Sequence, residues 1–498
     1  MSQPARRPSP VPPSRWILGA AILLAALPAI SQETVNTPGQ RFRIFGQTTS
    51  YLEFNQREDQ VPDEDYIKFK QLVSFNVEWS KFTIGAQAEY LYYSVDPDLV
   101  DPLDLDRLRE GFELRKYFID YQSDKFMGRL GTFFSSLGRG LTLYVQRNET
   151  LGFDEPIHGA VARLTLEHFD ITALGGQVTE PGREFEDLVA GGRIIGRLPL
   201  DLYLGGSAVR AELDRSSVQA TDVELWSLEA GGTSLWGVLD LAAEWSEIEK
   251  TEPTRVREGH GRYYSASASI GPVSVLAEYK DYYNFAYRYN QPPSAGRADE
   301  RYDHNDVKGP RLLVSTDFWS IGTLLHASYG EFNTHETPSS PGGTLGDHHR
   351  EWYAGIEQTV GRVYFQGSYF ERDWTDREIE ETHTIGDLHV TVGSSGELIL
   401  GYDQRLEEGS YFSLETTRTV LAYSLSPWGT VSLRYAFEDR SGYPRDDFWG
   451  VEVQFLPKTN VIVTVFIGGD PGGLVCAGGQ CRQEPRFEGS KLNFTWRF

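Results

Sequence analysis

From Arg41 to the C-terminus, apolar side chains recur at every second position of the chain. In residues 67–79 the apolar side chains, such as Phe75, fall on odd positions and the polar ones, such as Asn76, fall on even positions. In residues 82–92 the apolar side chains fall on even positions. A period of two is typical of β-strands with one apolar face. The alternation therefore predicts an all-β chain.

The composition agrees with a very large sheet. Aromatic residues make up 13% of the 498 residues and there are 50 glycines, but the chain has only two methionines. Abundant aromatics and glycines favour strands joined by tight turns over helical cores. The net charge is 47 − 71 = −24, which makes nucleic acid an unsuitable partner.

Connections between the expected strands alternate between short and long, with one exception at Glu408-Gly409, where the link is short. Sandwiches have no reason to sort loops this way, whereas outer-membrane barrels have short periplasmic turns and long extracellular loops. We therefore expect a transmembrane antiparallel up-and-down β-barrel of about 24 strands, within a range of 20–26. The long connections expected include residues 55–64, 95–109, 178–186, 249–259, 285–309, 332–348 and 469–485.

The N-terminus carries an export signal. Basic residues precede a short apolar stretch, and small side chains lead to an expected cleavage between Ser31 and Gln32. An uncleaved anchor is the alternative. The expected organisation is a signal peptide over 1–31, a short periplasmic segment over 32–40 and a barrel over 41–498.

The last residues alternate aromatic and polar side chains and end on Phe498. With Phe494 and Trp496, this strand resembles the C-terminal signature by which the barrel-assembly machinery recognises outer-membrane barrels. The resemblance implies a bacterial outer membrane as the location and its lipid as the surrounding medium.

Two further motifs resemble an uncharacterised family of large bacterial outer-membrane, porin-like β-barrels. They are LGRGL at 137–141 and CAGGQCR at 476–482, the second followed by Pro485, Phe487 and Gly489. The resemblance supports the fold and the location and implies no catalytic residue.

A barrel of this size has a wide lumen. Strands about 4.8 Å apart and tilted by about 40° give a diameter of roughly 45–50 Å, which wall side chains cannot fill. Only about nine residues separate Gln32 from Arg41, so we expect no N-terminal plug of the kind found in large active transporters.

Residues 135–154 interrupt the strand rhythm. Gly138 and Gly140 flank Arg139, and Arg147 follows. Glycines allow close backbone approach, and arginine is a fixed cation suited to anionic groups. Two interpretations remain open: a loop folded into the lumen as a pore constriction, or an extracellular extension of the fifth and sixth strands.

Cys476 and Cys481 are the only cysteines. Export leads to an oxidising compartment, and Gly478-Gly479 lets the chain turn back, so we expect a disulfide. A metal site is the weaker alternative, because two thiols need further ligands.

The remaining polar clusters do not indicate chemistry. An acidic run over 96–110 matches no defined calcium loop. The group Asp347, His348 and His349 lacks a third spaced ligand, and no catalytic motif stands at a credible position. We therefore expect no enzyme, no cofactor and no metal.

The sequence favours a porin-like channel for passive passage of small solutes, narrowed by inward loops. The alternative is a barrel that sheathes or docks another secreted protein, such as a cytochrome or lipoprotein, from the periplasmic or extracellular side. An outer-membrane enzyme is the weakest interpretation. Ion selectivity is left unassigned, because the net negative charge favours cations while Arg139 offers anions a binding point.

Overall fold

The computed structural model describes residues 35–37, 40–55, 66–93, 111–148, 153–179, 186–213, 221–252, 255–294, 306–335, 348–375, 378–477, 480–484 and 486–498. Regular structure in these residues is almost entirely strand, apart from the short 3-10 turn at Pro199–Asp201. No helix in this part of the chain is long and apolar enough to cross a membrane.

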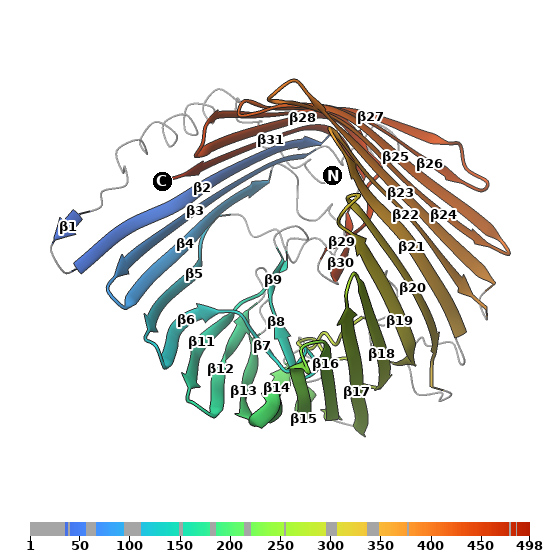
Figure 1. Ribbon diagram of the computed structural model, residues 1–498. Coiled ribbons are helices and arrows are strands. Elements are labelled where there is room, and N and C mark those ends of the chain that lie inside the picture. Colours follow the sequence, from blue (N-terminus) through green and yellow to red (C-terminus); the bar gives the residue numbers. More distant parts are fainter. Residues whose placement is uncertain are drawn as a thin grey trace, which may run out of the picture.

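The strands form one closed antiparallel barrel (Figure 1). The main sheet has 25 strands among the described residues; β1 (Val35–Thr37) pairs only with β2, and the other 24 make the wall. The wall strands are β2 (Gln40–Asn55), β3 (Tyr66–Trp79), β4 (Phe82–Tyr93), β5 (Gly111–Gln122), β6 (Phe126–Phe133), β11 (Ile157–Thr165), β12 (Phe169–Thr179), β13 (Glu186–Arg197), β14 (Leu202–Leu213), β15 (Thr221–Leu235), β16 (Leu239–Glu252), β17 (Arg255–Ile270), β18 (Val273–Tyr283), β19 (Asp306–Phe318), β20 (Thr323–Asn333), β21 (His348–Val360), β22 (Val363–Trp374), β23 (Ile379–Val392), β24 (Gly396–Gly409), β25 (Phe412–Leu425), β26 (Gly429–Arg440), β27 (Asp446–Lys458), β28 (Val461–Asp470) and β31 (Phe487–Arg497).

The first and last wall strands close the barrel. β2 pairs with β3 and also with β31, where Thr48 lies opposite Trp496. Gly46 and Phe498 exchange two backbone hydrogen bonds of 2.8 and 3.0 Å, so the terminal residue is part of the seam. The expected fold class is confirmed, and an even strand number is what allows this closing pair to be antiparallel.

Outer and inner faces follow the alternation of the sequence. Phe75 and Ile84 are 36% and 52% exposed on the outside, as the parity of their segments predicts. On β14 and β15, Ser207 and Ser227 face inward and are buried, while Leu204 and Leu228 on the opposite parity are exposed. Apolar groups outside and polar groups inside are the arrangement that lipid and an aqueous lumen require.

Exposed aromatic side chains mark two levels of the outer surface. Trp236, Trp319 and Trp428 lie at short turns, and Trp245 and Tyr264 lie further up neighbouring strands. From Leu239, the first residue of β16 after the turn at Trp236, to Trp245 the strand rises by roughly 15 Å along the barrel axis, at about 3.3 Å per residue and a tilt of about 40°. Aromatic residues at two levels of the outer surface are typical of outer-membrane barrels, whose apolar band lies between two aromatic girdles.

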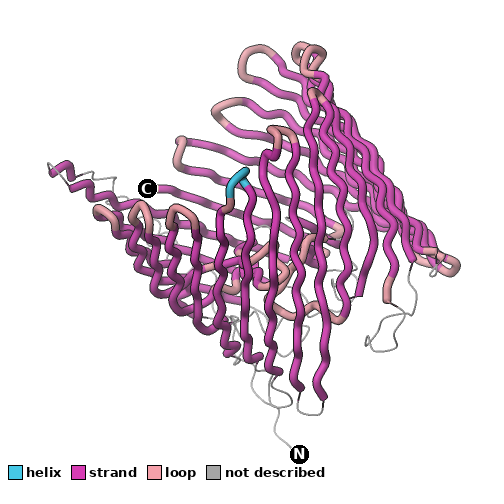
Figure 2. The backbone as a smooth tube through the Cα atoms, turned by 60° about the horizontal axis from the view of Figure 1, so that its bottom comes forward, coloured by secondary structure: helices cyan, strands magenta, loops and turns pink. Residues whose placement is uncertain are grey.

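Connection lengths alternate as expected, and the tube view in Figure 2 shows the short turns gathered at one end of the barrel. The predicted long loop at 249–259 is wrong, because β16 runs to Glu252 and β17 begins at Arg255. Its charged residues extend the hairpin instead: Glu252 pairs with Arg255 at 2.7 Å, so a polar strand pair is stable above the membrane. The short link after Glu408-Gly409 is present, since β25 begins at Phe412.

Candidate functional site in the barrel lumen

The chain between β6 and β11 turns into the lumen. It forms a small hairpin of β7 (Ser135–Leu137) and β8 (Leu143–Val145), followed by β9 (Arg147–Asn148) and β10 (Phe153–Asp154). Figure 1 shows β7 and β8 inside the ring of wall strands, next to β13–β16. We call residues 134–145 the inner hairpin.

Apolar packing attaches the inner hairpin to the wall. Leu137, Leu141 and Leu143 are no more than 1% exposed and belong to one cluster with wall residues. On the wall side this cluster includes Val209 and Leu225, whose positions on β14 and β15 face inward. Each fully buried leucine contributes about 1.5–3 kcal/mol, so this layer is firmly held.

One buried polar contact fixes the register of the hairpin on the wall. The Thr142 hydroxyl lies 2.7 Å from Ser207 Oγ and 3.0 Å from Ser227 Oγ, and the two serine hydroxyls lie 2.7 Å apart. All three side chains are buried. Since buried hydroxyls are costly when unpaired, this triad defines where the hairpin sits.

The turn of the hairpin rests on β16. The backbone N–H of Arg139 donates to Glu244 Oε2 at 2.8 Å. Gly138 has a φ of +64°, and a Cβ at this position would overlap the Glu244 carboxylate. Gly140 also has a positive φ, and a Cβ there would overlap the carbonyl of Gln291. Close packing against backbone therefore requires glycine at position 140, and a side chain at position 138 would displace the Glu244 carboxylate.

A second inward segment, residues 285–291, covers the inner hairpin. The Tyr287 hydroxyl donates to the Thr142 carbonyl at 2.7 Å, and Gln291 N–H donates to the Gly140 carbonyl at 3.0 Å. Tyr144 N–H donates to the Tyr289 carbonyl at 2.7 Å. Burial raises the pKa of the Tyr287 phenol far above its ordinary range, so it stays a neutral donor.

This covering segment also binds the wall directly. The Tyr289 hydroxyl donates to Asp187 Oδ2 at 2.6 Å, and Lys250 Nζ donates to the Ala286 carbonyl at 2.5 Å. Phe285, Tyr287 and Tyr289 are buried. The lumen therefore contains two segments that pack on each other and on the wall on the side of β13–β18. We call these two segments, residues 134–145 and 285–291, the inner layer.

The two arginines expected at the constriction lie in different surroundings. The Arg139 side chain is exposed, with its guanidinium carbon 5.6 Å from the ring centre of inward-facing Tyr263. Arg147 lines a cavity of about 1280 Å³ near the barrel seam. No aspartate or glutamate side chain lines this cavity. Four further cationic side chains line it: Arg43, Lys116, Lys458 and Arg497. The role of Gly138, Arg139, Gly140 and Arg147 in permeation stays a prediction.

A third hairpin, β29 (Gly473–Ala477) with β30 (Gln480–Glu484), lies within the barrel outline in Figure 1. Its register places Cys476 directly opposite Cys481. The Arg418 guanidinium donates to the Gly472 carbonyl just before this hairpin. The backbone pairing agrees with a disulfide, which stays a prediction.

Other expected features are placed as follows. Ser31, Gln32 and the acidic run over 96–110 lie outside the described residues. Phe494 and Trp496 lie on β31 and Phe498 follows it, but the structure does not test their role in insertion. His348 Nδ1 lies 2.7 Å from Asn333 Oδ1, whereas His349 is buried between the rings of Phe332 and Trp374.

Sequence reasoning missed the covering segment. Residues 285–309 were expected to form an external loop, yet 285–291 folds inward. Alternating aromatics at Phe285, Tyr287 and Tyr289 were the available signal, because three large rings are too costly to expose in a solvated loop.

Solved structures with a similar fold are large outer-membrane proteins. The siderophore receptor PirA from Pseudomonas aeruginosa is 11% identical with a TM-score of 0.52, over 91% of this chain and 80% of the receptor. A chain of the E. coli P pilus tip assembly intermediate PapC-PapD-PapK-PapG is 10% identical with a TM-score of 0.53, over 95% of this chain and 62% of that one. At these identities the likeness shows the fold alone.

No curated protein sequence matches the chain. A family described as being of unknown function, DUF6029, matches residues 14–304. That range includes the inner hairpin and its covering segment and ends before Cys476 and Cys481. It makes up more than half of the 498 residues, and the chain belongs to this family.

Proposed function

We propose that this protein is a porin-like channel of a bacterial outer membrane, exported with a cleaved signal peptide and surrounded by outer-membrane lipid. Small solutes pass through it without energy coupling, and the inner layer narrows the lumen. The observation that carries this proposal is the inner layer itself, in which Leu141 and Leu143 are fully buried against one side of the wall. A segment packed this firmly is a fixed restriction.

The charge of the cavity near the seam supports passage of anionic solutes. Five cationic side chains and no aspartate or glutamate side chain line it, although the whole chain has a net charge of −24. Lys116 is paired with Asp154 at 2.6 Å, and the other cations still leave the lining with an excess of positive charge. A pore lined by one sign of charge concentrates ions of the opposite sign. We propose no catalytic activity.

Planar-bilayer recording of the refolded full-length chain tests the channel. We expect stable ion-conducting steps that appear only with folded protein. Protein isolated separately from native membranes should contain the barrel without a stoichiometric partner. A tightly bound secreted protein together with absent conductance would instead establish the sheath function and refute the channel.

A further inference from the structure

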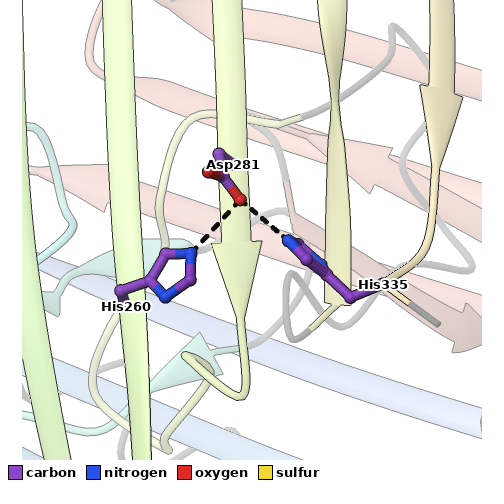
Figure 3. Close-up of side chains that lie close together, drawn as sticks. All are labelled: His260, Asp281 and His335. Carbon is purple, nitrogen blue, oxygen red and sulfur yellow. Dashed lines mark hydrogen bonds and ion pairs between the residues drawn. The ribbon is translucent and has the colours of Figure 1, made fainter. Parts of the chain in front are cut away.

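A separate group of side chains lies on the outside of the barrel, at the long-loop end of β17–β20. His260 is on β17, Asp281 is on β18, and His335 follows β20 (Figure 3). His260 shares its strand face with exposed Tyr264, and Asp281 shares its face with exposed Tyr279. Both polar side chains therefore point away from the lumen, just above the upper aromatic level.

The three side chains converge on one point. His335 Nε2 lies 2.9 Å from Asp281 Oδ1, and His260 Nε2 lies 3.3 Å from the same oxygen. All three ligand atoms lie within 4.8 Å of one another. A tetrahedral zinc ion with bonds of about 2.0–2.1 Å holds its ligand atoms about 3.3 Å apart. Small adjustments would suffice to enclose an ion.

Asp306, the first residue of β19, orients His335. Its Oδ1 lies 2.6 Å from His335 Nδ1 and accepts the His335 backbone N–H at 2.8 Å. In the tautomer that donates Nδ1–H to Asp306, the lone pair of His335 is on Nε2, directed at Asp281. A carboxylate behind a histidine is the usual partner of a metal-bound imidazole. Since neutral Nε2 and Oδ1 are both acceptors, a proton or a cation must lie between them.

The local charge also suits a dication. Arg262 contacts the other oxygen of Asp281, with Nη1 3.4 Å from Oδ2, and leaves Oδ1 available. On the same face, Lys308 lies opposite Asp281 and Glu247 lies opposite His260. With neutral histidines, the three carboxylates of Asp281, Asp306 and Glu247 outweigh the charges of Arg262 and Lys308 by one unit. An ion at this point would be partly buried, where such an imbalance matters most.

We propose that His260 Nε2, Asp281 Oδ1 and His335 Nε2 bind a divalent transition-metal ion of the zinc class, with Asp306 as the positioning residue. Two imidazoles and one carboxylate are a ligand set that zinc accepts, and water would complete the coordination. The site joins β17, β18 and the segment after β20 at the outer rim. This proposal differs from the expectation that the chain holds no metal. The sequence contains no sign of the site, because His260, Asp281 and His335 are too far apart in the chain to form a recognisable motif.

Titration of the tag-free, refolded full-length protein with Co²⁺, followed by visible absorption and then displaced by Zn²⁺, tests the site. We expect one saturable site with the intense spectrum of tetrahedral cobalt. His260→Ala and His335→Ala should each weaken binding at least tenfold, and Asp306→Asn by about 10–100-fold. Heat-modifiable migration on gels verifies that each variant is folded.

His383→Ala is the matched control. His383 Nε2 lies 3.0 Å from Asp403 Oδ1, but the described residues bring no third ligand to this pair. Its removal should leave cobalt binding unchanged. Absence of saturable binding to wild type, or equal affinities of wild type and His335→Ala, would show that a proton alone joins these groups and would overturn the proposal. Neither result depends on whether the barrel conducts.

Discussion

Gly138 lets the inner hairpin approach β16 closely. Its φ of +64° disfavours a side chain, and a Cβ at this position would force the Glu244 carboxylate to move away from the Arg139 N–H. We predict that Gly138→Ala leaves the barrel folded but loosens the hairpin. Limited proteolysis of the folded variant should cleave residues 138–145 several times faster than in wild type, since local opening controls cleavage.

Gly237→Ala is the matched control for this change. Gly237 also has a positive φ, +78°, but no heavy atom lies within 4 Å of a Cβ built there. Both substitutions carry the backbone cost of about 1–2 kcal/mol that a positive φ imposes on alanine. Only Gly138→Ala adds a steric overlap to that cost. Equal cleavage of the hairpin in the two variants would contradict the close packing.

Arg139 is the residue of the inner hairpin best placed to act on permeating ions. Its side chain is exposed beside the inward-facing Tyr263 ring. We predict that Arg139→Ala shifts the reversal potential in a salt gradient toward cation selectivity, without preventing insertion, because a fixed positive charge is removed from the lumen.

Arg210→Ala controls for loss of a positive charge elsewhere. Arg210 is 57% exposed and shares its strand face with outward-facing Leu204, so it lies outside the lumen. The Arg210→Ala substitution should leave the reversal potential unchanged. If Arg139→Ala also conducts like wild type, Arg139 has no part in permeation.

At the scale of elements, each strand has a lipid face and a lumen face that differ in their tolerance of charge. We predict that Phe75→Arg on β3 lowers the free energy of unfolding by about 2–4 kcal/mol, since its charge would lie in the apolar band. Asn76→Arg, on the opposite face and lining the cavity near the seam, should cost much less. Denaturant unfolding of the refolded barrels in lipid measures both, and equal losses would reverse the assigned faces.

The β29–β30 hairpin contains the two cysteines that we expect to form a disulfide. Cys476 and Cys481 are register partners, and directly opposed residues in antiparallel strands have Cα atoms about 4.5–5.5 Å apart, within disulfide range. We predict that protein from native membranes resists alkylation at both thiols until it is reduced, as mass spectrometry can show. In the chain-entropy model a ring this short contributes about 2 kcal/mol. Two freely alkylated thiols would refute the bridge.

The strands and their order were predictable from sequence because each obeys one local rule. Side chains such as Phe75 must meet lipid while Asn76 meets the lumen, and this requirement repeats in every strand. The error at 249–259 has the same origin. The charged residues near Glu252 and Arg255 indicated a loop by their polarity. Cross-strand ion pairs nevertheless allow such residues to extend a hairpin beyond the membrane.

The inner layer and the metal-binding group were not predictable in the same way, because both depend on contacts between distant segments. Thr142 meets Ser207 and Ser227 across 65 and 85 residues. His335 meets Asp281 across 54 residues. Periodicity shows which face a residue takes, but it does not show which other segment lies opposite that face. The glycines around Arg139 did indicate close approach, without identifying Glu244 as the neighbour.

At the scale of the whole molecule, a wall of 24 strands surrounds more space than its own side chains can fill. The inner layer occupies one side of that space, next to β13–β18. In our account this layer, and not the wall, sets the size of the conducting path. Removing the layer should therefore enlarge the path while leaving the wall and its insertion intact.

The most direct test compares single-channel conductance of wild type with a variant in which two glycines replace residues 136–144. Ser135 and Val145 are register partners, so the shortened chain joins ends that already lie together. We predict that wild type conducts and that the variant, folded and inserted equally well, conducts at least about twice as much, because a wider pore offers less resistance. Identical conductance of the two proteins, or no conductance from either, would contradict a channel narrowed by its own inner layer.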